Sequence, residues 1–160
     1  MNTRIPLAEA LVGLPLRDER AILDRLAVVI QGAFRRQAWF LLLDAQRAQL
    51  PVVIPMDLPR RPEPDPDAGF GRILEALGTL DDVAEIVVVF ERPGPDVVTD
   101  GDLAWLVGID EAIGSARLPV HGPFLATSAG IRRWRPHHDA SVDDAMMQEW
   151  PHEDDDHADP

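Results

Sequence analysis

The chain has 160 residues, the length of one domain with a sizeable core, and its lack of cysteine excludes disulfides and thiolate metal sites. Its net charge of −13 is uneven, because nine of the 28 acidic residues follow Arg135, where no Arg or Lys occurs. The other 19 acidic residues (28 − 9) oppose 15 arginines, and a net charge of −4 does not favour non-specific nucleic-acid binding.

The first half of the chain predicts a helix followed by a hairpin. Apolar residues at helical spacing indicate an amphipathic helix over 16–33. Apolar runs over 39–43 and 50–56 predict two paired strands, and the two prolines of the second place it at a sheet edge or a bulge. Residues 57–69 contain four prolines and are expected to form an exposed extended loop without helix.

The second half predicts alternating helices and strands. Helices are expected over 70–80 and 102–117, and strands over 86–90, 120–127 and 131–135. The run over 86–90 is uniformly apolar, which is typical of a strand covered on both faces. The element order predicts an α/β domain over 1–136, with three layers and a mixed sheet of about five strands flanked by helices.

No apolar run approaches the roughly 20 residues of a membrane span, and residues 1–15 do not resemble a signal peptide. We therefore expect a cytoplasmic protein without membrane contact. No phosphate-binding loop or serine nucleophile motif occurs, so no cofactor and no catalytic residue is predicted. Four of the five histidines follow Pro136, and His121 is interpreted as a structural residue, so no metal site is predicted either.

Residues 86–103 read as a strand, a Pro/Gly turn and the start of a helix, an arrangement that often carries an active site. Thr99 and Asp102 have the spacing of a capping box. Glu91 and Arg92, at the end of the strand, are expected to lie at the surface as solvated charges.

This segment resembles the JAB/MPN metalloprotease-like domain, in particular its bacterial RadC-type branch. The family has an apolar strand ending in His-x-His-Pro, then a Gly/Pro-rich loop and Ser-x-x-Asp at a helix start. Here the strand over 86–90, Pro93, and the Thr99-to-Asp102 segment match that pattern. The likeness covers about 39–134 and implies a cytidine-deaminase-like architecture.

The departures from the family concern its metal ligands. Phe90 and Arg92 stand where the two histidines should be, and only Asp102 is retained. The family's glutamate has no clear counterpart, with Asp57 as the nearest candidate. A catalytic zinc takes about three protein ligands, so the resemblance implies a domain that lacks the metal and serves as a scaffold, a pseudoenzyme.

The first hypothesis is therefore a non-catalytic protein-interaction domain. Its expected interaction face consists of Phe90, Glu91, Arg92, Asp96, Thr99 and Asp102. The alternative is a small-ligand-binding or metal-independent enzyme domain with a pocket near Glu91, Arg92 and Asp102. A third hypothesis is a nucleic-acid accessory protein, because Arg132, Arg133 and Arg135 cluster around Trp134 on the last strand.

Residues 137–160 are expected to form an acidic, largely disordered tail. A short helix is predicted over 141–150, where Val142, Met146 and Trp150 share one side and Met147 adjoins them. Two readings stay open: this segment docks on its own domain, or it folds into the groove of a protein partner. The identity of that partner and the oligomeric state are not encoded in any motif.

Overall fold

The computed structural model describes residues 13–62 and 64–136. Along the chain it contains α2 (Glu19–Val29), β1 (Gln37–Leu43), β2 (Gln49–Asp57), α3 (Pro66–Gly78), β3 (Glu85–Glu91), α4 (Asp100–Gly114), β4 (Val120–Thr127) and β5 (Gly130–Arg133). This order confirms the predicted α/β class. Within the described residues, no helix combines the length and apolar character needed to span a bilayer.

The five strands form one open mixed sheet in the order β2-β1-β3-β4-β5. β3 and β4 are parallel, whereas the other three neighbouring pairs are antiparallel. β2 lies at the edge, as its prolines predicted, because a proline has no N–H to donate to a second neighbour. The turn between β4 and β5 is closed by Gly130 at φ 136°, a conformation that glycine adopts readily.

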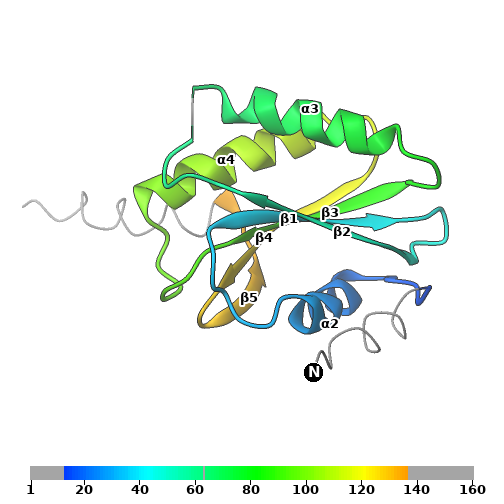
Figure 1. Cartoon of the computed structure of the whole chain (residues 1–160), viewed down its shortest axis with the longest axis horizontal. Coiled ribbons are helices and arrows are strands. Elements are labelled where there is room, and N and C mark those ends of the chain that lie inside the picture. The colour runs from blue at the N-terminus through cyan, green and yellow to red at the C-terminus, as the bar shows by residue number, and fades with distance from the viewer. Residues whose placement is uncertain (1–12, 63, 137–160) are drawn as a thin grey trace, which may run out of the picture.

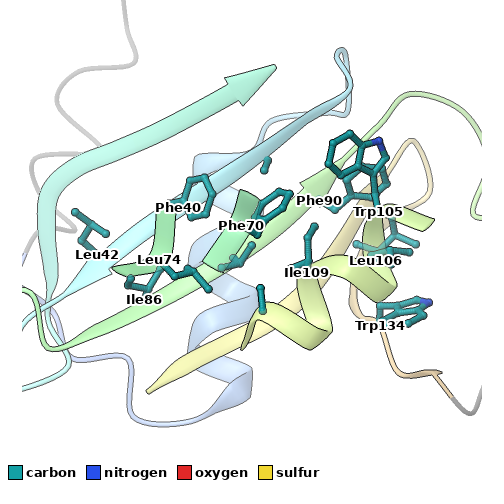
Figure 2. Packing of buried hydrophobic residues seen from close by; sticks show 14 residues of the cluster. Phe40, Leu42, Phe70, Leu74, Ile86, Phe90, Trp105, Leu106, Ile109 and Trp134 are labelled. Atoms are coloured by element: carbon teal, nitrogen blue, oxygen red, sulfur yellow. The ribbon is translucent and has the colours of Figure 1, made fainter. Parts of the chain in front are cut away.

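Helices cover both faces of the sheet, which gives the three predicted layers. α3 and α4 pack on one face and α2 on the other (Figure 1). The larger core lies under α3 and α4, where Phe70 contacts Phe40 and Trp105 through its ring (Figure 2). β3 is buried on both faces, as expected for a strand whose side chains enter both cores.

The start of α3 was predicted wrongly. The prolines of residues 57–69 indicated a loop throughout, but the helix begins at Pro66, four residues before Phe70. Proline is well suited to the first helical turn, where its missing N–H would have no intrahelical partner. Asp65 precedes it with φ 63°, a left-handed conformation that turns the chain into the helix.

Candidate functional site

The end of β3 directs its last side chains to opposite sides of the sheet. Phe90 belongs to the core under α3 and α4, and Arg92 continues on that side toward α4. Glu91 lies between them in sequence and contacts residues before and within β1 instead. This alternation follows from the pleat of the strand.

Asp102 is fully buried and holds two arginines. Its Oδ1 accepts a hydrogen bond from Arg36 at 2.9 Å, and its Oδ2 lies 2.7 Å from Arg92 Nε. The Arg92 contact is an ion pair without the alignment of a hydrogen bond. The Arg36 guanidinium also lies 5.7 Å from the centre of the Phe90 ring, within cation–π range.

The predicted capping box of α4 is confirmed and belongs to this network. Thr99 Oγ1 accepts from the Asp102 backbone N–H at 3.2 Å, and Asp102 Oδ2 accepts from the Thr99 N–H at 3.0 Å. Burial acts to raise the pKa of Asp102, but the hydrogen bonds from Thr99 and Arg36 and the charge of Arg92 together lower it below its usual value. Asp102 is therefore a structural anion at neutral pH.

Arg92 also organises the loop that leads to α4. Its guanidinium donates to the carbonyl oxygens of Pro93, Pro95 and Val97. Three loop carbonyls and one helix carboxylate thus converge on a single arginine. The loop is fixed from within by the residue that the family resemblance places at a metal-ligand position.

The Glu91 carboxylate accepts three hydrogen bonds on the other side of the sheet. One carboxylate oxygen accepts from the Phe34 backbone N–H at 3.0 Å, and the other accepts from Gln37 Nε2 at 2.6 Å and from the Trp39 indole. Glu91 is 2% exposed and Arg92 5% exposed. The expectation that these two residues are solvated at the surface is wrong.

The expected interaction face is accordingly not a surface. Phe90, Glu91, Arg92 and Asp102 are buried, and only Asp96 and Thr99 are exposed. The hypothesis of a pocket that uses Glu91, Arg92 and Asp102 meets the same obstacle, because the carboxylate oxygens of both acids accept bonds from within the domain. A bound substrate would have to displace those contacts.

An open groove of about 830 Å³ lies beside this network. Three segments line it together with Pro93: residues 34–36 before β1, 58–61 after β2, and 99–101 at the start of α4. It lies at the carboxyl end of β3, the strand end at which open α/β sheets commonly bind their ligands. Phe34, 76% exposed, contributes an apolar surface to it.

The groove is strongly cationic. Its lining carries four arginines, Arg35, Arg36, Arg60 and Arg61, against one acid, Asp100, a balance of +3 (4 − 1). Arg36 is used by Asp102, but in the described part of the chain no ion pair or hydrogen bond engages the other three side chains, which are exposed. Three unpaired guanidinium groups therefore face solvent in one depression.

The walls of the groove are held in place by contacts to α4 and to each other. The Trp105 indole donates to the Pro59 carbonyl at 2.9 Å, and the Leu58 N–H donates to the Arg36 carbonyl at 3.0 Å. A Cβ atom on Gly101 would come within 2.6 Å of the Arg60 carbonyl oxygen, so only glycine permits this approach. The arginines are presented by a backbone that is fixed before any ligand arrives.

The groove arginines were missed in the sequence. They occur as two adjacent pairs, Arg35–Arg36 and Arg60–Arg61, and this doubling was the only available signal. Nothing local shows that segments 25 residues apart meet at α4. The family's glutamate candidate, Asp57, is exposed at the end of β2 and no contact of it with Asp102 is seen.

The cluster on the last strand does not form a free basic surface. Trp134 is 1% exposed, Arg132 binds Asp96, and Arg133 and Arg135 lie near Glu19.

His121 lies 2.6 Å from Glu85, a partner that the sequence did not indicate. Among residues 13–62 and 64–136, no group of three possible metal ligands occurs. The tail residues Val142, Met146, Met147 and Trp150 lie outside the described part.

Comparison with protein-family models, curated proteins and solved structures gave no match.

Proposed function

We propose that this chain is a non-catalytic binding domain that holds an acidic segment of a protein partner in the arginine groove. The observation that carries the proposal is a set of three arginines, Arg35, Arg60 and Arg61, that have no ion-pair partner among residues 13–62 and 64–136 and that lie on a preorganised backbone. Carboxylates are the natural ligands of guanidinium groups, which bind them in a planar, two-pronged geometry. Exposed Phe34 offers an apolar contact beside the charges.

A protein partner is favoured over nucleic acid by the extent of the positive surface. A strand of nucleic acid needs a basic track along several phosphates, and it is repelled by acidic surroundings. Here the positive charge is confined to one groove in a body whose net charge up to Arg135 is −4. A short acidic peptide fits such a confined site.

We further propose that the domain is a metal-free version of the JAB/MPN fold. Support comes from the positions of Phe90 and Arg92, which lie on the same side of β3 as Asp102, the retained carboxylate. Arg92 places a fixed positive charge next to that carboxylate, where the resemblance would place a metal ion. The scaffold role implied by that resemblance agrees with a binding groove beside the lost ligand positions.

Reversing two groove charges tests the proposed function. In the full chain with the four consecutive carboxylates of residues 153–156 neutralised, so that they do not compete, R60E/R61E is expected to weaken binding of a fluorescein-labelled Glu/Asp peptide with one Trp by about tenfold. Loss of two exposed ion pairs at 0.2–1 kcal/mol each, with added repulsion, amounts to about 1.4 kcal/mol. Fluorescence anisotropy at low and physiological salt measures the affinity.

The control R20E/R117E makes the same change in net charge outside the groove, where both arginines are exposed. It is expected to leave the affinity unchanged. Equal weakening by both variants would show a non-specific effect of net charge. Tighter binding of an oligo-dT of equal charge than of the peptide would overturn the proposal in favour of a nucleic-acid ligand.

A further inference from the structure

We infer that the groove has an occupant within the chain itself: the acidic segment 150–156 of the C-terminal tail, which an external acidic partner must displace. This inference rests on the proposed function, since it names a resident competitor for the same site. It makes the tail a regulatory element. The argument uses the sequence of the segment, the point at which the chain leaves the domain, and its reach.

The segment has the chemistry that the groove selects. It reads Trp-Pro-His-Glu-Asp-Asp-Asp, an aromatic residue followed by four consecutive carboxylates, Glu153 to Asp156. The groove offers three unpaired arginines next to the apolar surface of Phe34, Leu58 and Pro59. Trp150 can contact that surface or stack on a guanidinium while the carboxylates pair with the arginines.

The chain leaves the domain beside the first half of α4, the helix whose start lines the groove. Trp134, two residues before the last described residue, packs in one core cluster with Leu106 of α4 (Figure 2). Leu106 is six residues from the start of α4, about 9 Å along the helix axis. β5 is also tied to the preceding loop by the Arg132–Asp96 ion pair at 2.8 Å. The exit point and the groove therefore border the first half of the same helix.

The linker is long enough for the segment to reach the groove. Trp150 lies fourteen positions after Pro136, and an extended chain of that length spans up to about 46 Å. A domain of this size has a radius of gyration of about 14 Å, so the linker covers the distance without full extension. For a flexible tether of this length, the effective concentration of the acidic segment at the groove is about 1 mM.

At that effective concentration even a weak contact matters. A segment with an intrinsic Kd of about 0.1 mM would occupy roughly nine-tenths of the grooves and weaken an external ligand about tenfold. Neutralising the segment in the variant E153Q/D154N/D155N/D156N is therefore expected to raise the affinity for the labelled acidic peptide about tenfold. The matched control D139N/D143N/D144N/E149Q removes four other tail charges and is expected to change it little.

A spin label provides direct evidence of contact. Because the chain has no cysteine, A158C accepts a nitroxide at one site in the otherwise intact protein. We expect the label to broaden the backbone amide signals of residues 34–36, 60–61 and 99–101, and E153Q/D154N/D155N/D156N to restore them. Broadening that appears only when labelled and isotope-enriched chains are mixed would mean contact between two copies and would overturn the inference.

The two proposals fail in different ways. If the groove amides stay sharp and the neutralised tail gives no gain in affinity, the resident-tail inference is wrong, while R60E/R61E still tests the groove. If the chain with the neutralised tail does not bind the acidic peptide at all, the proposed function is wrong. An equal gain from both tail variants would show general repulsion by the tail and would also overturn the inference.

Discussion

Replacing Asp102 by alanine is expected to lower the free energy of unfolding by about 3–5 kcal/mol, the cost of leaving a buried charge without its partner. Arg92 would keep its positive charge at 6% side-chain exposure with no carboxylate beside it. The variant also removes one half of the capping box of α4. Urea unfolding followed by circular dichroism measures the loss.

Asp100→Ala is the matched control for this prediction. Asp100 is also an acid in the first turn of α4, but it is exposed and contributes only its favourable charge near the helix N-terminus. Its removal is expected to cost less than about 1 kcal/mol. A similar loss in both variants would mean that the helix terminus, and not the buried ion pairs, accounts for the effect of Asp102.

The pH dependence of stability gives an independent test of the same network. The pKa of Asp102 is lowered in the folded protein from its usual 3.8, so its contribution is fully present above that value. The contribution is lost as the pH falls through the lower, folded-state pKa. The difference in unfolding free energy between the wild type and D102N is therefore expected to be constant from pH 7 to 5 and to shrink at acid pH. A difference that grows on acidification would show that burial raises this pKa.

The fold was predictable because its signals are local. Apolar periodicity located the helices and strands, and the prolines of residues 50–56 identified the edge strand. Thr99 and Asp102, which are three positions apart, predicted the start of α4. The helix predicted over 16–33 is shorter, Glu19–Val29, and the helix predicted to residue 117 ends at Gly114. The start of α3 at Pro66 was missed because proline ends a helix in its interior but favours its first turn.

The site was less predictable because its contacts join distant segments. Glu91 is charged and follows an apolar run, so a local reading places it in solvent. Its donors lie 52 to 57 residues earlier in the chain, and those of Asp102 include Arg36, 66 residues away. The groove likewise combines three segments that only the sheet and α4 bring together. The sequence predicts where the strand ends, but not which charged side chains are buried at that end.

Arg92 and Asp102 are expected to act as one unit in a double-mutant cycle. R92L alone leaves Asp102 buried with a single arginine and frees three loop carbonyls, at a cost of about 3 kcal/mol. D102N alone leaves Arg92 charged. In R92L/D102N neither unpaired charge remains, so the combined loss should fall short of the sum by about 1–3 kcal/mol.

The exposed pair Arg20–Asp24 calibrates that cycle. Its side chains are 83% and 68% exposed, and the coupling of such an i,i+4 pair is about 0.3–0.5 kcal/mol. A coupling between Arg92 and Asp102 no larger than this would mean that Arg36 alone neutralises the buried carboxylate. Arg92 would then serve only to bind the loop carbonyls. Its position beside Asp102 would not support the proposal that the positive charge of Arg92 replaces a metal ion. A strong coupling would show that the buried Arg92–Asp102 pair stabilises the loop, the helix start and the groove wall together.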